Sequence, residues 1–254
     1  MNYSGSNTFA LHTSPDLNTW TWVTNDVLAG VGYCEVGTAG CLPSPTGGKC
    51  GAFLPKVLFN PATRKWLLWW TCRGCSVATA PSPRGPWTVS SFNVTYADGA
   101  PVCRGSIEFF VDEPSHEAYL VKNWYNHSAE EVVSIERLDP SWTRSAAAST
   151  AVAYNAMTAA SSGLIGELGS ENAFLLKGPT GLYFLVEPSL CCFCPWGAGA
   201  SVFTAPTPLG PFTKRKQGEN AHATRAARLT RQFRVLSLYL PTSLSTTGWF
   251  TVKT

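Results

Sequence analysis

A ten-residue phrase occurs twice in this chain, about half a chain length apart. TAPSPRGPWT covers residues 79–88 and TAPTPLGPFT covers residues 204–213. Before each phrase comes a polar turn, a strand rich in aromatic residues (WLLWWTC or LYFLVE), a loop and a second strand. The repeated unit is therefore a group of short strands, and a fold made of such units has to pack them against one another.

Two weaker copies of this unit occur at residues 9–23 (FALHTSPDLNTWTWV) and 111–142 (VDEPSHEAYLVKNW, continued by VVSIERLDPSW). Each copy closes with a Pro or Asp-Leu turn followed by Trp or Phe, and we expect that ring to fill the core. In the repeated phrase, Gly allows an unusual backbone angle, Pro fixes the next one and the aromatic ring packs between units. Repeats of about 40 to 60 residues with a few short strands each predict an all-β propeller.

The composition agrees with an all-β chain of 254 residues. Charged residues make up 14% and aromatic residues 12%, with 18 Pro and 22 Gly, which is typical of strands and turns. The net charge of +3 is too small to indicate a nucleic-acid partner. No window approaches the roughly 18 consecutive apolar residues of a membrane helix. We therefore expect a single domain over residues 1–254 that binds neither nucleic acid nor membrane.

Glycosylation sequons and cysteines point to an oxidising compartment. Asn2, Asn93 and Asn126 each begin an Asn-x-Ser/Thr sequon, and the chain has nine Cys. The first residues, MNYSGSNTFA, contain no apolar signal-peptide core. We therefore expect an extracellular, monomeric glycoprotein whose export signal lies upstream of this sequence.

The cysteines allow two interpretations. Cys34, Cys41 and Cys50 bracket a Gly- and Pro-rich loop at residues 36–48, which would gain from a crosslink. Four other cysteines could supply thiolate ligands for zinc, although their second spacing is tighter than zinc sites prefer: Cys72, Cys75, Cys192 and Cys194. We favour disulfides or buried thiols, and expect no metal and no cofactor. Because nine is odd, at least one thiol stays free or pairs between chains.

Five segments resemble, in order, motifs of the family 43 glycoside hydrolases. SPDLNTWTWV resembles their S-x-D-L-x-x-W segment, LPKVLFNPATRKWLLWW their R-P-K-V-x-Y-N strand and IEFFVDEPSHEAYLV their LFVDDDGKAYL hairpin. SVATAPSPRGPWT resembles their A-x-S-x-S-P-x-G-P strand, and ENAFLLKGPTGLYFLVEPS their EAPALFKRNGYYYL strand. CCFCPWGAGASVFTAPTPLGPF looks like a Cys-rich fourth blade of members near the exo-β-1,3-galactanases.

The resemblance covers about residues 9–213, while residues 214–254 are weakly patterned. It implies a five-bladed β-propeller that hydrolyses O-glycosidic bonds of galactan-like polysaccharide or oligosaccharide with inversion. The chain begins after the strand that opens the first blade of the family and fades past Lys214. We therefore expect a propeller that is incomplete at its first and last blades.

The resemblance also implies a general acid. Inverting hydrolysis needs a protonated carboxylic acid and a base about 6.5–9.5 Å away. The acid needs a raised pKa, which partial burial and a second carboxylate provide. Glu171 opens the strand ENAFLL at the place of the family's general-acid glutamate.

Ser106 stands where many family members carry an aspartate that tunes this acid. A hydroxyl donates a hydrogen bond but does not repel a carboxylate charge. Glu108 shares its strand face with Ser106 because side chains alternate with period two, so we take Glu108 as the substitute. Ile107 and Phe109 are then expected to face the packing between blades.

The base and the sugar contacts complete the expected site. By loose alignment, Gln232 takes the place of a fifth-blade glutamine near the attacking water. Trp124 and Trp196 are candidate platforms for stacking sugar rings.

Two rival interpretations remain open at this point. A family carboxylate that precedes R-P-K-V is absent, since this chain has Phe53 and Leu54 there. That loss, together with Ser106, favours a carbohydrate-binding propeller without catalysis. The other rival is a truncated gene product that does not close its ring.

Overall fold

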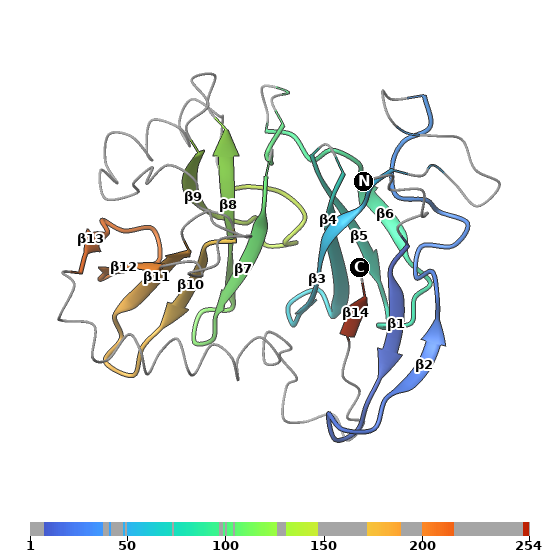
Figure 1. Cartoon of the computed structure of the whole chain (residues 1–254), viewed down its shortest axis with the longest axis horizontal. Helices are drawn as coiled ribbons and strands as arrows, with labels where there is room; N and C mark the ends of the chain where they lie inside the picture. Colours follow the sequence, from blue (N-terminus) through green and yellow to red (C-terminus); the bar gives the residue numbers. More distant parts are fainter. Residues whose placement is uncertain are drawn as a thin grey trace, which may run out of the picture. The chain divides into compact units, whose positions relative to one another are not determined.

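The computed structural model describes most of the chain and divides it into two compact units, Met1–Val94 with Val235–Thr254, and Thr95–Arg234 (Figure 1). All regular structure in the described part is β, in four antiparallel sheets, and no helix there could cross a membrane. The described residues are 8–37, 41, 48, 50–72, 74–96, 99, 101–103, 105–125, 131–146, 172–188, 200–215 and 251–253, with backbone alone for 123–125, 131–132, 188 and 251–253. The all-β prediction is confirmed, and the count of five blades stays a prediction.

The first unit contains two sheets. One has the strand order β14-β1-β2, with β1 at Ala10–Thr13, β2 at Thr21–Thr24 and β14 at Thr251–Lys253. The other has the order β3-β4-β5-β6, with bounds Phe53–Asn60, Lys65–Thr71, Cys75–Ala80 and Thr88–Ser91. Leu11 of β1 lies opposite Val252 of β14, so the last described strand joins the sheet of the first.

An aromatic cluster forms the core of this unit. β4 is buried on both faces, and Trp70 packs edge-on against Tyr33 with ring centroids 6.2 Å apart. The Trp70 indole N–H donates to the Tyr33 carbonyl oxygen at 2.9 Å, and the Tyr33 hydroxyl donates to Asp26 at 2.6 Å. Burial and the Asp26 carboxylate raise the pKa of Tyr33 far above its usual range. Each polar atom of the two rings is therefore hydrogen-bonded inside the core.

The second unit also contains two sheets. The order β7-β8-β9 has bounds Ile107–Asp112, Glu117–Tyr125 and Glu131–Arg137. The order β10-β11-β12-β13 has bounds Phe174–Lys177, Tyr183–Pro188, Ala200–Ala205 and Thr213–Lys214. One face of each sheet contributes to a shared apolar core, which includes Val121 and Ile135 from one sheet and Leu185 and Phe203 from the other.

The repeated phrase has the same structure in both units. Trp66 pairs with Ala80, and Tyr183 pairs with Ala205 at the matching register, so β4 and β11 are equivalent strands. Each phrase has a cis Gly-Pro bond after a glycine with positive φ, 93° at Gly85 and 99° at Gly210. Trp87 and Phe212 follow these turns and are 7% and 3% exposed. The predicted role of the phrase, a turn that delivers an aromatic ring to the core, is confirmed.

The expectation that every copy buries its closing aromatic ring is wrong for residues 9–23. Trp142, which closes the copy at residues 111–142, is buried, but Trp20 and Trp22 are 37% and 56% exposed. β2 is the outer strand of its sheet, and its burial pattern is exposed at both Thr21 and Trp22. The turn itself forms as expected, because the Asp16 carboxylate accepts backbone N–H bonds from Asn18 and Thr19 at 2.8 and 2.7 Å.

We expect Phe212→Leu to destabilise the protein by about 1 kcal/mol, because it removes ring contacts within a closed core while keeping an apolar side chain of similar size. Chemical denaturation of the oxidised chain measures this change. Leu209→Ala is the matched control, since Leu209 is exposed in the same turn, and we expect it to change stability by less than about 0.5 kcal/mol. Equal effects of the two substitutions would contradict the core role of Phe212.

Candidate functional site

Strands β7 and β10 are the first strands of their sheets and lie side by side (Figure 1). Asp112 ends β7 and Lys177 ends β10, and Lys177 Nζ lies 2.9 Å from Asp112 Oδ1. The Tyr183 hydroxyl donates to the other oxygen of Asp112 at 3.0 Å. The two strands therefore run in the same direction toward this ion pair. Their first residues lie together at the other end of the pair of strands.

Ser106 and Glu108 lie at the beginning of β7, and both are half-buried. Ile107 and Phe109 are buried on one face of the strand, so alternation puts Ser106, Glu108 and Phe110 on the other. Glu108 lies opposite Val121, which belongs to the core shared with the β10 sheet, and Phe110 packs on that core. Glu108 thus shares with Phe110 the strand face that meets the sheet of β10, and its part in the chemistry stays a prediction.

Asn172 shapes the beginning of β10 and was missed by the sequence analysis. Its φ is 56°, in the left-handed region that Asn tolerates better than most residues. Ala173, the next residue, is buried, and β10 starts at Phe174. The left-handed backbone at Asn172 changes the direction of the chain two residues before β10. The signal in the sequence was an Asn where the family motif has Ala.

A second left-handed residue marks the beginning of β3. Leu54 has φ 51°, which is uncommon for a bulky side chain and indicates local strain held by its surroundings. The pairing of β3 with β4 shifts register between Phe53 and Lys56. Phe53 is exposed there, so an apolar ring stands at the position where the family resemblance expects a carboxylate.

How the other predicted site residues lie relative to this pair is outside what the structure describes. Trp124 lies in β8, opposite Val132, with its backbone alone described. Glu171, Trp196 and Gln232 lie outside the described residues. The site that the structure describes is therefore the pair Ser106 and Glu108 beside the chain entry to β10.

A buried cluster of charged residues lies on the face of the sheet β7-β8-β9 that is opposite to Glu108. Lys122 is 1% exposed, and its Nζ lies 2.6 Å from Glu136 Oε1. It also donates to the Tyr96 hydroxyl and the Val102 carbonyl, and the Ser145 hydroxyl donates to Glu136 Oε2 at 2.6 Å. Burial lowers the pKa of Lys122, and the Glu136 carboxylate opposes this shift.

Register shows that this cluster is separate from the candidate site. Lys122 lies opposite Ile107, whereas Glu108 lies opposite Val121, so Lys122 and Glu108 belong to opposite faces of the sheet. The cluster is thus a structural element of the sheet rather than part of the candidate chemistry. The only signal in the sequence was a lysine in the apolar strand AYLVKNW.

Six cysteines in the described part are oxidised. Cys34 is bonded to Cys41 and Cys50 to Cys72, and Cys75 and Cys103 are also disulfide-bonded. The expected crosslink of the loop at residues 36–48 is confirmed. In the alternative zinc set, Cys72 and Cys75 are thus oxidised, and Cys192 and Cys194 lie outside the described residues. The bonds fit an oxidising compartment.

No protein-family model matches this sequence, and no curated protein does. Solved structures do match. A thermostable family-43 glycoside hydrolase aligns with TM-score 0.56 and 16% identity over 84% of this chain and 66% of its own. The chain has the fold of the family-43 glycoside hydrolases.

Two further solved structures of this fold belong to glycosidases with a stated activity. An α-L-arabinofuranosidase from Clostridium thermocellum aligns with TM-score 0.52 and 15% identity over 85% of this chain and 63% of its own. A family-43 β-1,3-galactosidase aligns with TM-score 0.51 and 16% identity over 83% of this chain and 40% of its own. The chain spans between 40% and 66% of the length of these three proteins, and at such identities the likeness concerns the fold.

Proposed function

We propose that the protein is a glycoside hydrolase that cleaves O-glycosidic bonds in galactan-like polysaccharide with inversion of configuration. The observation that carries the proposal is the half-buried pair Ser106 and Glu108 at the beginning of β7, beside the chain entry to β10. Glu171 directly precedes that entry. A second carboxylate at a neighbouring strand start raises the pKa of an acid because their charges repel each other. The fold that carries this pair is shared with family-43 hydrolases.

Each residue has a role in this proposal. Glu171 protonates the leaving oxygen, and the charge of Glu108 keeps the pKa of Glu171 high by repulsion. Ser106 donates a hydrogen bond to a carboxylate of this pair or to the substrate. Gln232 positions the attacking water, and Trp124 and Trp196 stack on sugar rings. The protein works outside the cell as a monomer without a cofactor.

Product analysis tests the reaction directly. The oxidised chain is incubated with β-galactan oligosaccharides, and the anomer released first is followed by NMR. Inversion predicts the α-anomer as first product, whereas the β-anomer would contradict the assignment. Phe53 and Ser106 stand in place of family carboxylates, so a carbohydrate-binding propeller without catalysis is the alternative outcome of this experiment. Retention on a galactan column without any hydrolysis would establish that rival.

We expect Glu108→Gln to move the basic limb of the pH profile to lower pH by about one unit, with activity retained at its optimum. The sign follows from the proposed role. Activity at high pH is lost when the acid ionises, and removing a nearby negative charge makes ionisation easier. The pH dependence of kcat/KM on galactan measures the limb.

Glu113→Gln is the matched control for this prediction. Glu113 is exposed in the turn after Asp112, at the end of β7 opposite the site. Its charge is far from the start of the strand, so its substitution should leave the limb in place. An identical shift in both variants, or a shift of Glu108→Gln toward higher pH, would contradict the role of Glu108.

A further inference from the structure

One glycosylation sequon of the chain lies in a turn that directly follows β6. Asn93, Val94 and Thr95 form this sequon. Asn93 and Thr95 are exposed, whereas Val94 between them is 2% exposed. The two side chains that define the sequon are thus in solvent, while the residue that is free to vary anchors the turn in the core.

Strand β5 holds the backbone of this turn. The Asn93 N–H donates to the Ser76 hydroxyl at 3.3 Å, and the Val94 N–H donates to the Cys75 carbonyl oxygen at 2.6 Å. Asn93 has φ 51°, in the left-handed region that Asn tolerates better than most residues. Both bonds use backbone donors, so they fix the position of Asn93 without occupying its side-chain amide.

Gly74 leaves room for the side chain of Asn93. Gly74 is buried, and a Cβ atom built there would overlap Asn93 Oδ1. The amide oxygen therefore lies against Gly74, and the amide nitrogen lies on the other side of the planar amide group. Because the nitrogen is the atom that carries an N-linked glycan, a glycan on Asn93 extends away from this contact.

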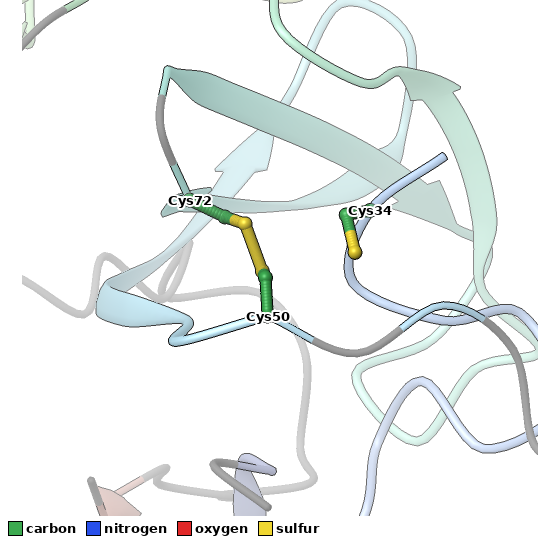
Figure 2. Close-up of side chains that lie close together, drawn as sticks. All are labelled: Cys34, Cys50 and Cys72. Carbon is green, nitrogen blue, oxygen red and sulfur yellow. A yellow bond between two sulfur atoms is a disulfide. The ribbon is translucent and has the colours of Figure 1, made fainter. Parts of the chain in front are cut away.

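The disulfides of the same unit match the compartment in which such glycans are added. Cys50 is bonded to Cys72, which follows β4 (Figure 2), and Cys75 in β5 is also disulfide-bonded. Disulfides form and persist in secretory compartments, and N-linked glycans are attached to secreted chains. The oxidised cysteines and an exposed sequon therefore fit one route of synthesis.

The position of β6 gives a glycan at Asn93 a function. Among the strands that the structure describes, β6 pairs with β5 alone and is the outer strand of its sheet. Its sequence, TVSS, has no charged residue, and Thr88 and Ser90 are exposed. Proteins protect such edges from pairing with other chains by charges, prolines or bulges. A bulky hydrophilic glycan two residues after β6 would protect this uncharged edge.

We propose that Asn93 carries an N-linked oligosaccharide that shields the open edge of β6. In this modification, Nδ2 of Asn93 forms a bond with the anomeric carbon of the first sugar. The bond between that carbon and the diphosphate of a lipid-linked oligosaccharide donor breaks. The lipid diphosphate is the leaving group, and the amide nitrogen gives up one proton.

Site mapping of the unmodified sequence tests the proposal. The full chain, joined to an export signal, is translated in the presence of microsomes, and only protease-protected chains are analysed. Enzymatic release of an N-linked glycan converts its asparagine to aspartate, which mass spectrometry detects in the peptide that contains Asn93. We expect Asn93 to be occupied in most protected chains. An unmodified Asn93 in these chains would overturn the proposal.

Two substitutions remove the acceptor in different ways. Asn93→Asp removes the amide but keeps a residue that tolerates the left-handed backbone, and Thr95→Ala keeps the amide but removes the hydroxyl of the sequon. Each variant should carry one glycan fewer than the wild type. Thr95→Ser is the matched control and should keep the glycan, because serine preserves the sequon. Unchanged glycan numbers in Asn93→Asp and Thr95→Ala would contradict the assignment.

Self-association tests the shielding role. Thr95→Ala and Thr95→Ser are expressed in a glycosylating secretory host, and light scattering is compared over a series of protein concentrations. We expect Thr95→Ala to associate at lower concentration than Thr95→Ser. Adding Ser90→Lys to Thr95→Ala should reverse this change, because a lysine on an edge strand opposes edge pairing. Equal scattering of Thr95→Ala and Thr95→Ser would overturn the shielding role.

Discussion

Glu171→Gln is expected to lower kcat/KM on β-galactan oligosaccharides by about 10²- to 10⁴-fold, the usual contribution of a general acid. The amide cannot protonate the leaving oxygen, and a sugar alkoxide is a poor leaving group without that proton. An aryl β-galactoside with an acidic phenol needs no such proton. Its hydrolysis should therefore keep most of the wild-type rate, and the ratio of the two substrates measures the acid role.

Two comparisons make this prediction specific to proton transfer. Glu113→Gln, on an exposed turn, should leave both substrates unaffected. The melting temperature of Glu171→Gln should match that of the wild type, which excludes unfolding as the cause. Equal losses on galactan and on the aryl galactoside would indicate that Glu171 binds the sugar or supports folding, and would remove it as the acid.

Local chemistry made the repeated phrase predictable from the sequence. Gly and Pro fix the backbone of the turn by themselves, and the alternation of strand residues sets which side chains share a face. The matching registers of Trp66 with Ala80 and of Tyr183 with Ala205 follow from these two rules. The same alternation placed Glu108 correctly relative to Ile107.

Tertiary features were less accessible. The exposure of Trp22 depends on β2 being the outer strand of its sheet, and the sequence of β2 alone does not encode that position. Disulfide connectivity cannot be read from cysteine spacing, so the pairing of Cys50 with Cys72 required the structure. The left-handed conformation of Asn172 follows from the path of the chain into β10, a constraint that only the packed sheet imposes.

The ion pair of Lys122 with Glu136 is another tertiary contact that the sequence alone does not predict. We expect its loss to have a large effect on stability. The residues are 14 positions apart and meet because Lys122 lies opposite Ser134 while Leu120 lies opposite Glu136, which puts both charges on one face of adjacent strands. A buried ion pair costs desolvation of both charges, and each partner then depends on the other.

We expect Lys122→Met to destabilise the protein by about 3–5 kcal/mol, because it leaves the Glu136 carboxylate buried without its cation. Chemical denaturation of the oxidised chain gives the free energy of unfolding. Arg137→Ala is the matched control: its ion pair with Glu117 joins side chains that are 55% and 40% exposed, and its loss should cost less than about 1 kcal/mol.

The double variant Lys122→Met with Glu136→Leu distinguishes an unpaired charge from lost packing. Removing both charges also removes the desolvation that the single variant leaves uncompensated, so the double variant should be more stable than Lys122→Met alone. Additive losses would instead mean that the two side chains contribute independently of each other. In that case the hydrogen bonds that Glu136 accepts from the hydroxyls of Tyr96 and Ser145, rather than its ion pair, would account for its contribution to the stability of this sheet.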